Sequence, residues 1–181
     1  MAHDNAKTLK EGLSKAVKMI EDRIFIDLWD SGVQILKFLG IIHPIQGWLG
    51  FTGNTQTSYA CGIYMDGNLE GIITQDNWRD SPRRKKVPRG KSVYLKNPYE
   101  GSPRVAVGSV DVDDNYGLDT SISFLQSYKA PKGRVAIVVT TGTEYSEYIE
   151  TVRHLDVLTR TFAESPRIIN ANWKKIDSLG A

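Results

Sequence analysis

The sequence predicts an α+β fold, in which a long N-terminal helix and shorter helices pack on one face of a mostly antiparallel β-sheet, with a long basic loop. Three observations predict it. Apolar residues recur at helical spacing from Leu9 to Leu39, two β-compatible runs flank an Asp-Gly turn at Asp66, and a β-branched run covers Val135 to Thr141.

The chain has 181 residues, of which 40% are hydrophobic and 24% charged. This length suits one globular domain and is too short for two full ones. We therefore expect a single domain over residues 1–181. Its expected segments are a long helix (1–40), a loop and hairpin (41–75), a basic loop (76–104), and a part that completes the sheet and ends in helices (105–181).

The expected N-terminal helix has apolar side chains along one face and Lys, Glu and Asp over much of the opposite face. Gly40 and Pro44 are expected to end it, and Gly32 predicts a kink or a break into two helices. A helix of about 30 residues would be ~45 Å long, so part of it must pack beyond a small core. The apolar positions are Leu9, Leu13, Ala16, Val17, Ile20, Ile24, Leu28, Ile35, Phe38 and Leu39.

The expected sheet begins with a hairpin. Gln56–Met65 and Leu69–Gln75 are its strands, and Asp66-Gly67-Asn68 is its turn. Val105–Val112 is a further short strand of this sheet. Val135–Thr141 is apolar and β-branched throughout, which is typical of a central strand covered on both faces.

Two shorter helices are expected in the C-terminal half. Asp119 is a suitable N-cap for a helix through about Tyr128, with Ile122 and Leu125 turned inward. Ser165-Pro166 suits the N-cap and first position of a terminal helix. In that helix the side chains expected to face the core are those of Ile168, Ile169 and Trp173.

Residues Asp76–Arg104 carry a concentrated positive charge. They hold nine basic residues against three acidic ones, a local charge of +6, whereas the rest of the chain has fourteen against eighteen, a charge of −4. Prolines and glycines interrupt regular structure, so we expect a long loop or extended hairpin of the kind that usually has a function. The residues expected to contact a partner protein or DNA are Arg79, Arg83, Arg84, Lys85, Lys86, Arg89 and Lys91.

This loop admits more than one interpretation. Its cations would neutralise phosphates if it binds nucleic acid, with Trp78 or Tyr94 available for stacking on bases. Alternatively, it is a solvated loop, or it docks on the acidic surface of a neighbouring subunit.

The sequence offers little for catalysis. The three histidines, His3, His43 and His154, lack metal-site spacing, and Cys61 is the only cysteine. Asp111–Gly117 is similar to a calcium loop but lacks its bidentate glutamate. We predict no catalytic residue, no cofactor and no metal site. A cysteine hydrolase built on Cys61 is the alternative hypothesis, against a cysteine buried as a small apolar residue.

No apolar run reaches the ~20 residues that cross a bilayer, and the first residues do not form a secretory signal. We therefore expect a soluble protein made in the cytoplasm.

The order of several segments carries a resemblance. A long helix leads through Gly47–Thr55 into Ser58–Gly67, and later Phe124–Gly133 precedes the strand Val135–Thr141 and the segment Gly142–Glu150. This order resembles the tail-completion, or head-to-tail connector (neck), proteins of tailed bacteriophages. The positions that carry the family signature are Thr52, Gly53, Asn54, Tyr145, Tyr148 and Glu150.

The resemblance implies a structural virion protein that joins the capsid or portal to the tail around the DNA channel. It implies a homo-oligomeric ring of six- or twelve-fold symmetry. This ring would contact portal, neck or tail proteins of the virion, and its lumen would bring it close enough to contact DNA. The protein would be located at the neck of the virion, and in the host cytoplasm during assembly. The signature residues are structural in this family, which has no catalytic site to transfer.

The alternative function is a phage-encoded DNA-binding protein that uses the basic loop 79–91 as a phosphate clamp. Its affinity for DNA would fall steeply with salt concentration.

Overall fold

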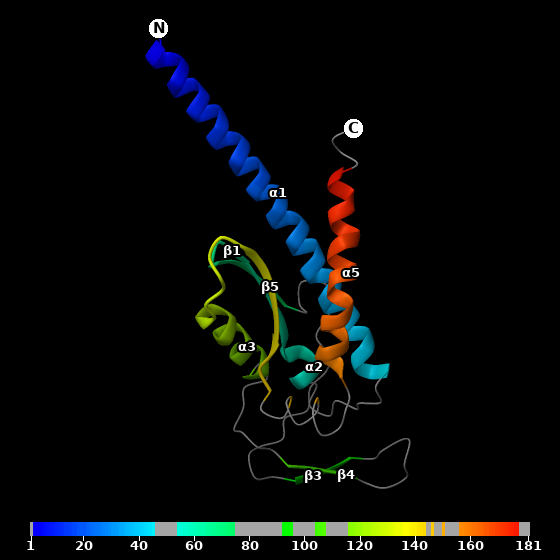
Figure 1. The fold of residues 1–181 in the computed structure, drawn as a ribbon. Coiled ribbons are helices and arrows are strands. Elements are labelled where there is room, and N and C mark those ends of the chain that lie inside the picture. The colour runs from blue at the N-terminus through cyan, green and yellow to red at the C-terminus, as the bar shows by residue number, and fades with distance from the viewer. Residues whose placement is uncertain are drawn as a thin grey trace.

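The structure is a computed structural model, and it describes residues 2–45, 54–74, 92–95, 104–107, 116–143, 146, 150 and 156–177. The main sheet is antiparallel with strand order β2-β1-β5, so the predicted α+β class is confirmed (Figure 1). The elements are α1 (Ala2–Ile45), α2 (Asn54–Ser58), β1 (Tyr59–Met65), β2 (Asn68–Thr74), β3 (Ser92–Leu95), β4 (Arg104–Val107), α3 (Tyr116–Ser127), β5 (Val135–Thr141) and α5 (Val157–Asp177).

The sheet is covered on both faces, so the prediction that all helices lie on one face is wrong. Tyr59, Cys61 and Ile63 of β1 pack in one cluster with residues of α1 and α5. Ala60 and Tyr64, which alternate with them, pack in a second cluster with α3. Because β1 is apolar at nearly every position, both of its faces must be buried.

The expected central strand lies at an edge. In the described part of the chain β5 pairs only with β1, and its side chains are mostly half-buried. β1 takes the central position because it pairs with β2 on one side and β5 on the other. The predicted strand Val105–Val112 does not join this sheet within the described residues. Instead, β4 pairs with β3 in a separate antiparallel ladder, which agrees with the extended hairpin considered for the basic segment.

The predicted β1–β2 hairpin is confirmed, but its first strand begins at Tyr59 and not at Gln56, because Gln56 and the two residues after it belong to α2. Asp66 and Gly67 have φ angles of 50° and 83°, which is the backbone of a type I′ turn. The turn is tied to the start of β5 by two hydrogen bonds. The backbone N–H of Gly133 donates to Asp66 Oδ1 over 2.7 Å, and the N–H of Asp66 donates to the carbonyl of Arg134 over 3.0 Å.

The N-terminal helix is longer than predicted and is not broken at glycine. A Cβ atom at Gly32 would lie 2.6 Å from Ile73 Cδ1 and 3.1 Å from Cys61 Sγ. Gly32 therefore allows α1 to approach the sheet closely, and it causes no break. Gly40 is buried inside α1, which continues to Ile45, so the predicted end of the helix at Gly40 was wrong.

The terminal helix also begins earlier than predicted. Pro166 lies inside α5, so Ser165-Pro166 is not its start. The apolar positions of the helix already begin at Val157, which is fully buried. The predicted inward side of α5 is confirmed. Ile168 is buried, Ile169 is half-buried and Trp173 packs against the core.

The helix predicted after Asp119 is confirmed with an earlier start. α3 begins at Tyr116, so Asp119 lies in its first turn and is not the N-cap. Leu125 is fully buried and Ile122 packs against the same cluster, as predicted.

Candidate functional site

Most of the residues singled out from the sequence lie outside the described residues. This applies to the whole set from the basic loop, Arg79, Arg83, Arg84, Lys85, Lys86, Arg89 and Lys91. It applies equally to Thr52, Gly53, Tyr145 and Tyr148. Asn54 is the first residue of α2, and Glu150 is described.

Glu150 caps the N-terminus of α5. Its carboxylate accepts hydrogen bonds from the backbone N–H of Leu158 over 2.9 Å and of Thr159 over 3.4 Å, and from Thr159 Oγ1 over 3.3 Å. The first N–H groups of a helix have no partner within it, and a negative charge there is favourable. Glu150 therefore has a structural role, since it ties the segment before α5 to the helix itself.

Cys61 is not arranged as a nucleophile. Its side chain is fully buried in β1, and burial raises the pKa of the thiol from 9.0 to about 12. The thiol is therefore neutral near pH 7, whereas the thiolate is the reactive form. In the described ranges no three His, Cys, Asp or Glu side chains are grouped so that they could hold a metal ion.

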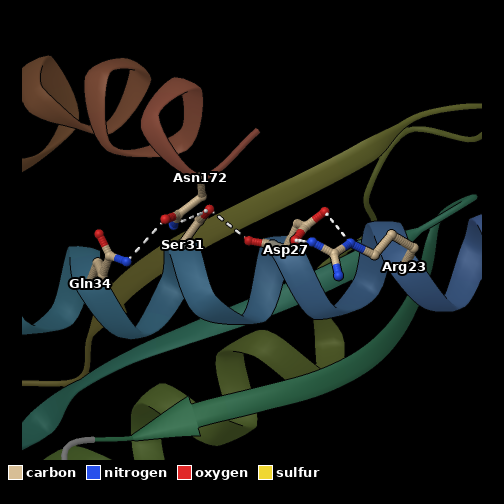
Figure 2. Close-up of polar contacts among 5 residues, drawn as sticks. All are labelled: Arg23, Asp27, Ser31, Gln34 and Asn172. Atoms are coloured by element: carbon tan, nitrogen blue, oxygen red, sulfur yellow. Dashed lines mark hydrogen bonds and ion pairs between the residues drawn. The ribbon is translucent and has the colours of Figure 1, made fainter. Parts of the chain in front are cut away.

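A chain of polar contacts fixes α5 on α1, and we call it the polar clasp (Figure 2). Asn172 Nδ2 donates to Ser31 Oγ over 3.0 Å, and Gln34 Nε2 donates to Asn172 Oδ1 over 3.0 Å. Ser31 Oγ donates to the carbonyl of Asp27 over 2.7 Å, and Arg23 pairs with the Asp27 carboxylate at 3.2 Å. The two helices run in opposite directions, and the clasp sets their register (Figure 1).

The N-terminal half of α1 projects away from the rest of the molecule (Figure 1). Every residue from 5 to 22 is exposed. Leu9, Leu13 and Ile20 are 64%, 59% and 60% exposed although they are large and apolar. They lie on one side of the helix in a set that we call the N-terminal stripe, which consists of Leu9, Leu13, Ala16, Val17 and Ile20.

The N-terminal stripe continues the side of α1 that α5 covers. At 3.6 residues per turn, Ile20 lies within about 20° of Asp27 and Ser31 around the helix axis. Gly32, which packs on the sheet, lies about 120° from Ile20 by the same measure. The stripe is therefore the extension, beyond the polar clasp, of the helix–helix contact between α1 and α5.

A second exposed apolar surface lies on α5. Phe162 is 82% exposed, the largest value among the exposed large hydrophobic side chains of the described residues. Its exposed neighbours on the helix are uncharged. We call this surface the Phe162 face, and it consists of Thr159, Phe162, Ala163 and Pro166. Sequence reasoning missed it because the terminal helix was predicted to start at Ser165, whereas the helical period starts at Val157.

No protein-family model, no curated protein and no solved structure matches this chain. Among the helices in the described residues, none is both long enough and apolar enough to cross a bilayer.

Proposed function

We propose that this protein is a structural component of the neck of a tailed bacteriophage. Copies of it assemble head-to-tail into a ring around the DNA channel and join the capsid or portal to the tail. It acts through the surfaces that it presents to copies of itself and to neighbouring virion proteins.

The observation that carries the proposal is the division of α1 into two halves with different surroundings. The C-terminal half supplies Leu28, Ile35, Leu36 and Leu39 to the core. The N-terminal half continues as a helix and exposes an apolar stripe. Large apolar side chains that are gathered on one side of a solvated element mark a protein–protein contact more often than a structural need of the monomer.

The resemblance to neck proteins supports the same proposal from the sequence. It supplies what the helix alone does not, which is the class of assembly and its place in the virion. A heterologous contact closes into a ring when its rotation divides the circle. Six- and twelve-fold rings are the forms that the resemblance implies.

The test is to interrupt the gene in the genome that encodes it and to examine the particles by electron microscopy. We expect DNA-filled heads and separate tails, and we expect the protein supplied from a plasmid to restore joined particles. Antibody against the protein should label the head–tail junction. Intact infectious particles that lack the protein would contradict the proposal.

The charge of the basic loop favours a second candidate function, DNA binding by residues 79–91. Affinity for a duplex of random sequence should then fall steeply between 50 and 200 mM salt, roughly in the manner of a protein that contacts several phosphates. Replacement of Arg83, Arg84, Lys85 and Lys86 by Ala should remove most of that affinity. If the same replacement leaves DNA binding unchanged, this candidate is rejected.

A further inference from the structure

We propose that the Phe162 face of one copy packs on the N-terminal stripe of the next copy, with the Phe162 ring seated over Gly12. The inference rests on the proposed function, since it names the contact that joins neighbours in the ring. It assigns to each other two of the exposed apolar surfaces of the described residues.

Gly12 provides the space for a large side chain on the stripe. Residues at i, i+3, i+4 and i+7 of a helix surround a hole into which a side chain of a partner helix inserts. Around Gly12 such a hole is formed by Leu9, Gly12, Leu13 and Ala16, of which two are large and two are small. A shallow, open depression of the surface lies here, over Asn5, Thr8, Leu9, Gly12 and Leu13.

The two glycines Gly12 and Gly32 of α1 differ in a way that supports this assignment. At Gly32 an added Cβ would meet buried side chains of the sheet, so packing within the chain requires glycine. At Gly12 no described atom lies within 4 Å of an added Cβ. Glycine is unfavourable in the interior of a helix. The described contacts of this chain do not explain why position 12 holds one. A side chain of a partner explains it.

The Phe162 ring that we place over Gly12 belongs to another copy, because the polar clasp keeps Phe162 far from Gly12 in the same chain. Gly12 precedes Ser31 by about 28 Å of helix, and Phe162 precedes Asn172 by about 15 Å. Since α1 and α5 run in opposite directions, these lengths extend to opposite sides of the clasp (Figure 1). Phe162 therefore lies roughly 40 Å from Gly12 along the paired helices.

The contact is also compatible in direction and charge. A helix already packs on this side of α1, because α5 of the same chain does so through the clasp. The exposed neighbours of Phe162 on α5 carry no charge. The carboxylate of Glu150, which lies against Thr159, already accepts hydrogen bonds from the start of α5, so covering the face leaves no charge without a partner. Because the two surfaces are different, the contact is heterologous, and each copy keeps one surface for each neighbour.

Two single variants test the contact. Leu13→Asp alters the stripe, and Phe162→Asp alters the face. Both side chains are more than half exposed, so thermal unfolding temperatures should change little. By native mass spectrometry we expect the unaltered chain to form closed oligomers and each variant alone to be mainly monomeric. The matched control, Glu11→Lys, changes charge on the opposite side of α1 and should assemble like the unaltered chain.

Mixing the two variants distinguishes this contact from others. Leu13→Asp retains a working face and Phe162→Asp retains a working stripe, so an equimolar mixture should form a dimer with one copy of each and nothing larger. A contact between two stripes would form no such dimer. A mixture that stays monomeric, or variants that assemble like the unaltered chain, would overturn the proposal.

Gly12→Met provides a second test that does not depend on added charge. Methionine favours the helix more than glycine does, so the helix content measured by circular dichroism should not fall. The protein concentration at which half of the chains are in oligomers should nevertheless rise at least tenfold, because the methionine side chain fills the hole that would receive Phe162. If Gly12→Met assembles as well as the unaltered chain, the proposed seat of Phe162 is wrong.

These outcomes separate the inference from the proposed function. Rings that form in all the variants would reject the contact and leave the neck protein proposal standing. A chain that stays monomeric alone and is absent from virions would reject both.

Discussion

At the scale of single residues, Gly142 has the most restrictive surroundings among the glycines whose neighbours the described residues include. A Cβ there would lie 2.1 Å from the carbonyl oxygen of Gly117 and 2.6 Å from the backbone nitrogen of Ser121. Both atoms belong to the backbone of α3, which cannot move without loss of its packing on the sheet. We expect Gly142→Ala to lower the free energy of unfolding by about 2 kcal/mol or more, as measured by urea denaturation. Gly12→Ala is the matched control and should change it by less than about 0.5 kcal/mol, because its Cβ meets no described atom and the residue lies on the exposed, projecting half of α1. Equal effects of the two substitutions would contradict this account.

Cys61 predicts how stability changes at alkaline pH. Burial raises the pKa of its thiol from 9.0 to about 12, so the folded state keeps a proton that the unfolded chain releases above pH 9. The stability that the folded state gains from keeping this thiol protonated is therefore complete below pH 9. It is lost as the pH rises toward 12, at a limiting rate of ~1.4 kcal/mol per pH unit. Burial also raises the pKa of Tyr64 above its ordinary 10.0, so its share of the loss falls mainly above pH 10, and comparison with Cys61→Ala between pH 9 and 10 isolates the thiol. Urea denaturation across that interval should show a clearly shallower loss of stability for Cys61→Ala than for the unaltered chain. The same slope in both would contradict the prediction.

At the scale of elements, local signals predicted the fold better than pairings between distant segments. The hairpin was predicted because Asp66 and Gly67 adopt the turn that their residue types favour. The edge position of β5 was missed because a β-branched run has the same composition at an edge as at the centre, and β1 took the central place. Gly32 was misinterpreted because the sequence does not reveal Ile73 opposite it. The apolar residues of the N-terminal stripe were predicted from their helical spacing. Their exposure was not, because it depends on where the sheet ends along α1. The Phe162 face was hidden by Pro166, which usually starts a helix and here lies inside one.

The polar clasp makes a prediction at the same scale. Asn172 is buried and bonds both Ser31 and Gln34 of α1. Asn172→Ala should lower the free energy of unfolding by about 1–3 kcal/mol, since buried polar atoms of Ser31 lose a partner. Asn170→Ala, at an exposed position of α5, should change it by less than about 0.5 kcal/mol. Guanidinium denaturation of both variants checks this, and the prediction fails if the two substitutions cost the same.

At the scale of the whole molecule, we expect the projecting half of α1 to contribute to assembly and not to the stability of the monomer. Isolated helices of this length are marginal in water, so residues 2–22 are helical because they extend a helix that the core already holds. Complete burial of a Leu, Ile or Val side chain contributes about 1.5–3 kcal/mol of favourable free energy. The Leu, Ile and Val side chains of the stripe are half to two-thirds exposed. Covering each of them in a contact between copies therefore adds roughly 1–2 kcal/mol. Association costs about 4–15 kcal/mol, so one such contact is weak and closure of a ring must supplement it. Deletion of residues 2–22 should therefore leave the thermal unfolding temperature of the monomer within a few degrees of the full chain, since all of residues 5–22 are exposed and none belongs to the core of the described residues. The same deletion should abolish closed oligomers at every concentration tested by analytical ultracentrifugation. A truncated chain that unfolds at much lower temperature would place the projecting half in the folded core, and one that still closes into rings would place the subunit contact elsewhere on the molecule.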